Sequence, residues 1–485
     1  MTELDPHACD TLLRGVVVTM DAGRRAFLDG YVAVRGSRIV GVGRWADCGF
    51  AATETLGGEG HLVLPGLVNV HAHLVQGCIR GMAEGTTFEE RLFGFYYPMT
   101  GACDEDRSYD SAMPPLLDLV RSGVTTTADD HFTHVHRRSI DGVLRAVRDT
   151  GMRCRMARLT INDANAVPEP FRETLDAGLR ETERVQAEWE DERISVTAST
   201  IGITYCEPDQ LKALWEWTVA HGRQFDIHAP AVFDQKYLAA RRGWTGGSFE
   251  WLADTGILSP NVIAAHAQNL RPGEAELIRQ CGASIALVPD MEQVLGLVNF
   301  DSRPYLDKGV VCGLGLDGPV VAYGHDLWTA MRSFLTSQRN GDQHRRLKAE
   351  AGAKWTGDEM LFGSGELALE LATIGGARAL MMDDRIGSLE VGKQADVLLI
   401  DRRGETQLSP PAALIANLVY GNGPAADAIR RVMVGGRTIV RDGEHVSVDR
   451  REAVRRSDAL QDTLLDEVSA RRFVRMRSRF DWVGS

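Results

Sequence analysis

Short runs of β-branched and apolar residues mark the first sixty positions of the chain. Residues 15–20 (GVVVTM), 31–34 (YVAV) and 38–42 (RIVGV) are separated by glycine and charged residues, a pattern typical of strands joined by turns. From residue 61 onward, apolar runs alternate with longer amphipathic segments. This alternation indicates repeated βα units, whose strands form a parallel sheet.

Eight strand-like apolar runs follow one another through the central part of the chain. Together with the amphipathic segments between them they cover about 300 residues, the size of a (β/α)8 barrel with inserted loops. The expected barrel strands are residues 62–73, 123–130, 152–159, 194–200, 224–229, 262–267, 283–289 and 310–317.

Strands of the first kind return near the end of the chain, at 397–401, 429–434 and 437–441. We therefore expect an α/β fold in which a distorted (β/α)8 TIM barrel carries a small β-sandwich domain formed from both chain ends. A charged helical segment follows the last strand. The predicted domains are the composite sandwich (1–64 and 381–448), the catalytic barrel (65–380) and a C-terminal helical tail (449–485) that packs on its own subunit or on a neighbour.

Composition narrows the choice of partners and compartment. Lys and Arg number 54 against 67 Asp and Glu, so the net charge of −13 disfavours nucleic acid as the main partner. The eight cysteines are scattered without a CxxC pair, which favours reduced thiols over a disulfide framework or a cysteine zinc site. The start MTELDPHACD has no secretory pattern, and no run approaches the length of a membrane span. We expect a cytoplasmic protein without a membrane partner.

Polar residues end several of the predicted barrel strands. His71 and His73 alternate along one strand and so point to the same side. His228, His266 and Asp317 end three other apolar runs. Each side chain is costly to bury alone, whereas one metal ion at the carboxyl-terminal mouth of a barrel satisfies them together.

The motifs around these residues extend the pattern over nearly the whole chain. The sequence resembles the amidohydrolase superfamily, in particular its cytosine deaminase-like branch, which includes the triazine chlorohydrolases. Six motifs carry this resemblance. They are 65–74 (PGLVNVHAHL), 80–81 (RG), 121–126 (RSGVTT), 264–266 (AAH), 313–318 (GLGLDG) and 386–396 (IGSLEVGKQAD).

The resemblance implies a single divalent ion and assigns its ligands. The metal ligands fall on His71, His73, His228 and Asp317, with His266 beside the attacking water. Asp317 and His266 are then the catalytic residues: Asp317 accepts a proton and returns it to the leaving group, and His266 orients the nucleophile. Residues 194–200 contain no lysine that could bridge a second ion. Zinc suits these ligands best, and iron, cobalt and manganese are compatible with them.

The resemblance implies a metal-dependent hydrolase that cleaves a non-peptide C–N bond of a small heterocycle, as a deaminase does. Deaminases of this branch carry a proton-donating glutamate three residues after the histidine at 228, where this chain has Ala231. Either another acid replaces it, or the substrate needs no ring protonation. The candidate acids are Glu292, Asp290, Asp234 and Glu84. The second alternative fits an amide, urea or (thio)carbamate hydrolase resembling the phenylurea and molinate hydrolases.

Further residues are candidates for binding the small-molecule substrate. These are His131, Arg80, Glu292 and His266, with the aromatic run 93–99 (FGFYYPM) as a candidate lid over the mouth. A third hypothesis is a non-catalytic scaffold. It is weaker, because a scaffold has no need for three histidines and an aspartate that converge on one point. The resemblance also implies a homo-oligomer.

Overall fold

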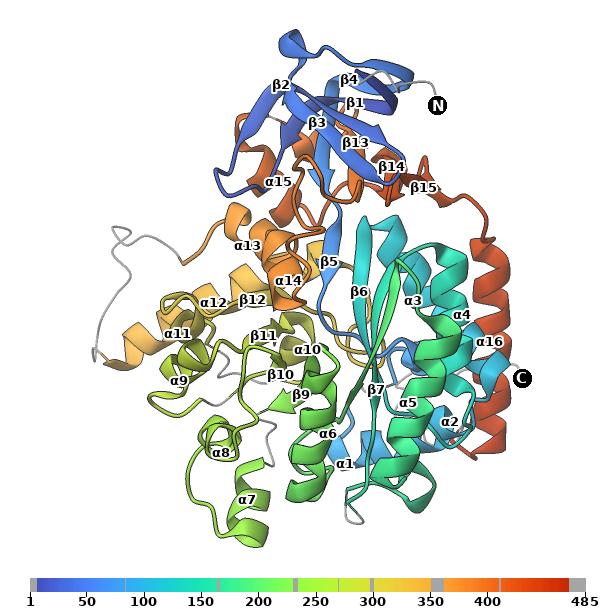
Figure 1. Ribbon diagram of the computed structural model, residues 1–485, viewed down its shortest axis with the longest axis vertical. Coiled ribbons are helices and arrows are strands. Elements are labelled where there is room, and N and C mark those ends of the chain that lie inside the picture. Colours follow the sequence, from blue (N-terminus) through green and yellow to red (C-terminus); the bar gives the residue numbers. More distant parts are fainter. Residues whose placement is uncertain are drawn as a thin grey trace.

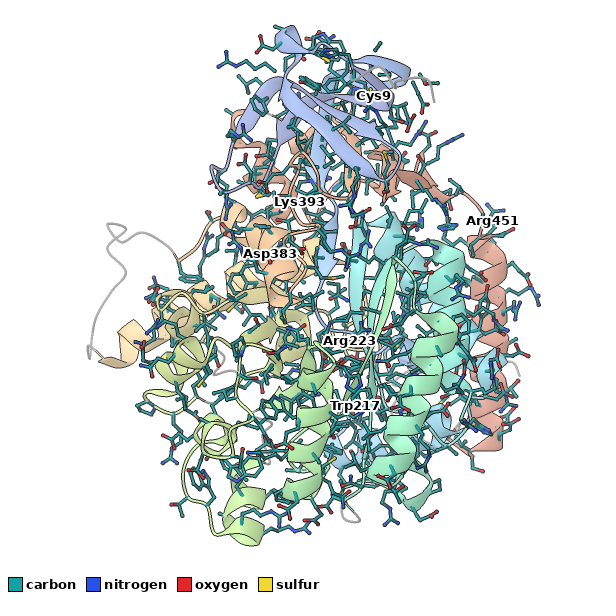
Figure 2. All side chains as sticks on the ribbon, in the orientation of Figure 1. Cys9, Trp217, Arg223, Asp383, Lys393 and Arg451 are labelled. Atoms are coloured by element: carbon teal, nitrogen blue, oxygen red, sulfur yellow. The ribbon has the colours of Figure 1, made fainter. Side chains whose placement is uncertain are left out.

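The fold was analysed in a computed structural model of the chain, which describes residues 7–82, 84–163, 166–229, 234–268, 270–296, 301–349, 362–409 and 411–470. The molecule consists of a β-domain formed by the two chain ends and a larger α/β barrel beneath it (Figure 1). Side chains fill the interior between the barrel strands and the surrounding helices (Figure 2). Within the described ranges, no helix has the length and apolar character needed to cross a membrane.

The two chain ends meet in one sheet of eight strands, with the order β16-β15-β14-β13-β4-β1-β2-β3. The junction is the antiparallel pair of β4 and β13, in which Val63 lies opposite Leu399. Buried side chains from both ends, such as Leu13, Val32 and Val397, share one core. The strands are β1 (Ala8–Val18), β2 (Ala26–Arg35), β3 (Arg38–Arg44), β4 (Ala51–Pro65), β13 (Val397–Asp401), β14 (Ile429–Val434), β15 (Arg437–Arg441) and β16 (Glu444–His445).

The predicted barrel is confirmed, and it is distorted. Its eight parallel strands form two sheets of four, β5-β6-β7-β8 and β9-β10-β11-β12. Single bridges close the two seams between the sheets, Ala72 with Asp317 and Gly202 with His228. The strands are β5 (Leu67–Asn69), β6 (Val124–His131), β7 (Arg153–Leu159), β8 (Ile194–Ser199), β9 (Phe225–Ala229), β10 (Val262–His266), β11 (Ser284–Leu287) and β12 (Cys312–Leu314).

The first predicted barrel strand, 62–73, is two strands in the structure. β4 ends at Pro65 in the terminal sheet, and β5 begins at Leu67 in the barrel. Gly66 between them donates its N–H to the carbonyl of Asp396. A Cβ atom at this position would lie 2.1 Å from Thr125 Oγ1, so only glycine fits where the chain passes from one domain to the other.

Helices cover the outside of the barrel, and the C-terminal helix α16 packs along α3 (Figure 1). Arg107 pairs with Glu467, and Gln461 donates to the carbonyl of Cys78, so the described part of the tail docks on its own barrel. Residues 471–485 lie outside the described residues. The α-helices are α1 (Phe88–Arg91), α2 (Tyr97–Gly101), α3 (Glu105–Arg121), α4 (Ser139–Thr150), α5 (Leu175–Trp189), α6 (Pro208–Ala220), α7 (Asp234–Arg242), α8 (Ser248–Asp254), α9 (Glu274–Cys281), α10 (Pro289–Val294), α11 (Arg303–Leu306), α12 (Leu327–Ala349), α13 (Gly365–Leu371), α14 (Ile374–Ala379), α15 (Leu414–Tyr420) and α16 (Arg450–Glu467).

Shorter helical turns complete the chain. Two of them, the 3-10 turn η2 and the π-helix η3, follow the first barrel strand and so lie near its mouth. The turns are η1 (Trp45–Asp47), η2 (Leu74–Ile79), η3 (Leu92–Tyr96), η4 (Glu169–Phe171), η5 (Thr406–Leu408), η6 (Pro411–Ala413) and η7 (Ala426–Ala428).

A buried ion pair supports the strand that carries His228. Asp226 lies two residues before His228 on β9, so both side chains point to the same side of the strand. Arg155 on β7 donates to both carboxylate oxygens of Asp226, and both residues are about 95% buried or more. A buried charge is costly unless it is paired, so the two side chains stay together. Their contact joins β7 of one sheet to β9 of the other, across the seam between β8 and β9.

Replacement of Arg155 should therefore destabilise the barrel. We expect Arg155→Met to lower the free energy of unfolding by about 3–5 kcal/mol, since it leaves Asp226 buried and unpaired. Urea denaturation followed by circular dichroism measures the change. The matched control is Arg455→Met, which removes an exposed arginine of α16 that pairs with Glu452 and should leave the midpoint unchanged. Equal midpoints for both variants would contradict a supporting role for the buried pair.

Candidate metal centre

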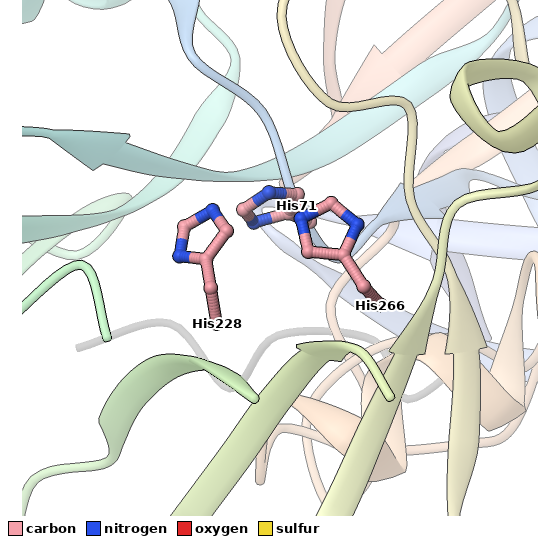
Figure 3. A group of neighbouring side chains, drawn as sticks. All are labelled: His71, His228 and His266. Atoms are coloured by element: carbon pink, nitrogen blue, oxygen red, sulfur yellow. The ribbon is translucent and has the colours of Figure 1, made fainter. Parts of the chain in front are cut away.

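Five polar side chains predicted from the sequence meet at the carboxyl ends of the barrel strands. His71 and His73 follow β5, His228 lies in β9, His266 ends β10, and Asp317 follows β12. Figure 3 shows His71, His228 and His266 with their rings turned toward one another. The possible ligand atoms of the five residues form two groups that share His71. One group adds His228 and His266, and the other adds His73 and Asp317.

The distances between the ring nitrogens and the carboxylate are short. Nε2 of His73 lies 3.3 Å from Nε2 of His228 and 3.5 Å from Oδ1 of Asp317. Nε2 of His71 lies 4.0 Å from the same oxygen. These contacts link the Nε2 atoms of the three histidines and the Asp317 carboxylate into one compact cluster.

Backbone carbonyl groups fix the protonation of two of these rings. Nδ1 of His73 lies 2.7 Å from the carbonyl oxygen of Asp130, and Nδ1 of His228 lies 2.7 Å from that of Ile201. Because a carbonyl oxygen only accepts, both rings must donate from Nδ1, which leaves a lone pair on each Nε2. The 3.3 Å contact between the two Nε2 atoms is then not a hydrogen bond. A cation between them would satisfy both lone pairs.

His71 completes the same arrangement. Its Nδ1 lies 3.4 Å from Oδ2 of Asp130, and its Nε2 is buried without a hydrogen-bond partner. Burial lowers the pKa of His71, but Asp130 outweighs this effect and the pKa is raised. The negative charge of Asp130 therefore favours a cation on Nε2 of this ring, and a metal ion takes the place of the proton when it binds. These three nitrogen atoms fit a metal ion, which accepts imidazole lone pairs, while carbonyl and carboxylate groups hold the opposite nitrogen of each ring.

The ionisation states also suit metal ligation. Burial lowers the pKa of His73, and it lowers that of His228 well below the usual range. Burial would raise the pKa of Asp317, but the imidazoles of His73, His266 and His71 outweigh it and the pKa is lowered. Neutral imidazoles and an ionised carboxylate are the forms that bind divalent ions.

Two of the five residues have left-handed backbone conformations. φ is +73° at His266 and +65° at Asp317, values that cost non-glycine residues about 1–3 kcal/mol and cluster at functional sites. Oδ1 of Asp317 also accepts the N–H of Gly318 at 2.6 Å. The strained ends of β10 and β12 thus set the direction of both side chains.

The centre lies at the base of a cavity of about 560 Å³. His73, His228, His266 and Asp317 form part of its wall. The aromatic run predicted as a lid contributes Tyr96 and Tyr97, whereas Phe93 is 50% exposed and lies outside the lining. Polar lining residues that no sequence pattern indicated include Gln76, Arg91 and Gln268.

Two residues that were predicted to bind the substrate instead form contacts outside this cavity. Arg80 pairs with Asp118 at 2.7 Å. Nε2 of His131 contacts the carbonyl of Thr133 and the hydroxyl of Ser139 at 3.1 Å, and burial lowers its pKa to about 3. Neither residue is part of the cavity lining, and both are explained by contacts within the scaffold.

The candidate acids differ in their positions. Glu292 is 3% exposed and lies against the cavity-lining Gln268; burial raises its pKa well above the usual range. Asp234 lines the cavity itself. Asp290 is held by Ser333, and Glu84 is exposed. Ala231, where related deaminases have a glutamate, lies outside the described residues.

Comparison with known proteins places the chain among metal-dependent hydrolases. A 5-methylthioadenosine/S-adenosylhomocysteine deaminase of Syntrophobacter fumaroxidans is 29% identical over 450 residues, 92% of this chain and 96% of the relative. A 5'-deoxyadenosine deaminase of Methanothermobacter thermautotrophicus is 27% identical over 430 residues, 88% of this chain and 92% of the relative.

Solved structures share the fold. A zinc-bound adenosine deaminase of Xanthomonas campestris has a TM-score of 0.82 at 21% identity and covers 95% of this chain and 100% of its own. A mutant atrazine chlorohydrolase of Arthrobacter aurescens, complexed with zinc and atraton, has a TM-score of 0.81 at 24% identity and covers 93% and 100%. Residues 62–439 match the amidohydrolase family. Because this match spans most of its length, the chain belongs to the amidohydrolase family.

Proposed function

We propose that this protein is a metal-dependent hydrolase that releases ammonia from an aminated heterocycle by attack of water at the carbon of a C–N bond. The observation that carries the proposal is the convergence of three imidazole Nε2 lone pairs and the Asp317 carboxylate at the base of the cavity. The relatives whose names specify deamination of adenosine derivatives support the reaction class.

In this proposal His71, His73, His228 and Asp317 hold one divalent ion, and that ion is zinc. Imidazole and carboxylate ligands suit zinc, and iron, cobalt and manganese accept the same set. Zinc is also the metal named for two structural neighbours. When bound, such an ion supplies a Lewis acid that lowers the pKa of a water from 15.7 to about 7.

The residues around the ion have separate roles in the proposed reaction. Asp317 accepts the proton of the attacking water and returns it to the departing nitrogen. His266 is neutral because burial lowers its pKa to about 4, so its ring can orient the water and donate to the developing negative charge. Burial raises the pKa of Glu292 well above its usual range and favours its protonated form; in the proposal its carboxyl group positions Gln268, which lies against it and lines the cavity.

The cavity volume suits a small-molecule substrate. Arg80 and His131 are not part of the proposed site, because their contacts lie elsewhere. The homo-oligomer and the cytoplasmic location remain predictions from the sequence.

An assay of product release tests the reaction class. We expect the zinc-loaded protein to release ammonia from at least one aminated purine, pyrimidine, pterin or triazine in a panel that includes 5-methylthioadenosine and 5'-deoxyadenosine. The same panel contains N-aryl amides, ureas and thiocarbamates. Turnover confined to these carbonyl compounds, with release of an amine or thiol, would overturn the deaminase proposal.

Metal content tests the ligand set. We expect purified protein to contain about one divalent ion per chain, and the variant with both His71→Ala and His73→Ala to lose it, because two of four ligands are removed. Inductively coupled plasma mass spectrometry measures the ratio. The matched control is His221→Ala, which removes an exposed histidine bonded to the carbonyl of Trp217. Full metal content in the double variant would exclude this site.

A single substitution separates catalysis from metal binding. We expect His266→Ala to keep its metal but to lower kcat by about 10²–10³-fold, the usual effect of losing one group that stabilises developing charge. Metal analysis and steady-state kinetics on the same preparation measure both effects. Loss of the ion from this variant would instead make His266 a ligand.

A further inference from the structure

The loop that joins β12 to α12 carries Asp317 near its start and His325 near its end (Figure 1). His325 is 1% exposed, and its Nε2 lies 3.1 Å from the carbonyl oxygen of Asp317. Because a carbonyl oxygen only accepts, Nε2 must carry a hydrogen and donate it. A buried hydrogen bond therefore joins the two ends of this loop.

This bond completes a set of three contacts that hold Asp317. The N–H of Asp317 donates to the carbonyl of His71 at 3.1 Å. Its Oδ1 accepts the N–H of Gly318 at 2.6 Å, and its carbonyl group accepts the hydrogen bond from His325. The backbone on both sides of the Asp317 Cα atom and the rotation of its carboxylate are thus each fixed by a separate hydrogen bond.

Both ends of the loop have left-handed backbone conformations. φ is +65° at Asp317 and +39° at His325, and such conformations persist only where the surrounding structure holds them. Oδ1 of Asp317 lies 3.5 Å from Nε2 of His73. Since rotation about φ swings the Cβ atom relative to the preceding backbone, a relaxed Asp317 would turn its carboxylate away from the histidines.

Other contacts anchor the middle of the loop and do not involve Asp317. The N–H of Gly81 donates to the carbonyl of Pro319 at 3.3 Å. Nη1 of Arg80 lies 3.3 Å from the carbonyl oxygen of Tyr323. These contacts tie the loop to the turn that follows η2, and they do not depend on the ring of His325. The loop should therefore stay folded when that ring is replaced.

The second ring nitrogen of His325 shows that the first one matters. Nδ1 is buried and has no hydrogen-bond partner within the described residues. A buried polar atom without a partner is costly, and an apolar side chain at this position would avoid the cost. His325 is also not part of the cavity lining. The contact to Asp317 is therefore the feature that explains a histidine here.

We propose that His325 is a positioning residue of the metal centre, which holds the Asp317 carboxylate toward the histidines through its hydrogen bond to the Asp317 carbonyl group. The inference rests on the proposed function for the identity of the ligands, and it gives a role to a residue that this function does not use. Removal of a group that orients a metal ligand typically weakens metal binding by about 10–100-fold.

Zinc affinity tests this role, with competition against a fluorescent chelator as the measurement of Kd. His325→Phe and His325→Leu both remove the donor, so the comparison does not depend on one of them folding. We expect either variant to raise the zinc Kd by about 10–100-fold. His325→Gln can place an N–H near the position of Nε2 and should restore most of the lost affinity. The matched control is His221→Phe, which removes an exposed histidine bonded to the carbonyl of Trp217 and should bind zinc as the wild type does.

The cobalt(II)-loaded protein separates positioning from a loss of stability. Its visible absorption spectrum depends on the geometry of the ligands, so we expect the spectrum to change in His325→Phe and to return in His325→Gln. The melting temperature of each metal-free variant shows whether it is folded. A folded His325→Phe or His325→Leu protein with the wild-type zinc Kd and cobalt spectrum would overturn the proposal, and so would equal losses of affinity in His325→Phe and His325→Gln.

Turnover is not measured in these experiments. A protein that shows the expected changes but releases no ammonia would overturn the proposed reaction and leave the role of His325 standing. Equal zinc Kd values in the wild type and the donor-free variants would overturn the role of His325 and leave the proposed reaction standing.

Discussion

The hydrogen bonds from His73 and His228 to backbone carbonyl groups are the constraint on which the site depends. They hold the proton of each ring on Nδ1 and leave two lone pairs facing each other at 3.3 Å. With His71 held against Asp130, a third lone pair points to the same place. The barrel thus fixes ring orientation and protonation before any ion binds, and a cation is the simplest partner for the arrangement.

The same residues lie where the barrel closes. The bridges between its two four-stranded sheets join Ala72, between the first two histidines, with Asp317, and Gly202 with His228. Ligands from both sheets therefore meet across seams that are held by few backbone hydrogen bonds, and an ion bound by both sides would strengthen them. The pair of Arg155 and Asp226 crosses one seam below the histidines. The contacts that close the barrel and the residues that would bind the ion therefore lie close together.

Much of this could be predicted from the sequence. The eight strands and the five polar residues at their ends follow from apolar runs and from motifs with fixed spacing. The domain boundary was predicted at residues 64 and 65, but the need for glycine at position 66 was not, because it depends on Thr125, which is distant in the sequence. Arg80 follows the first barrel strand and His131 ends the second, but they bond to Asp118 and Ser139, partners that only the folded helices supply.

The most direct test of the central claim is anomalous diffraction at the zinc edge from crystals of the zinc-loaded protein. The account predicts one peak at about 2.0–2.2 Å from Nε2 of His71, His73 and His228 and from a carboxylate oxygen of Asp317. Coordination through Nδ1, or a barrel mouth without a peak in fully loaded protein, would contradict it.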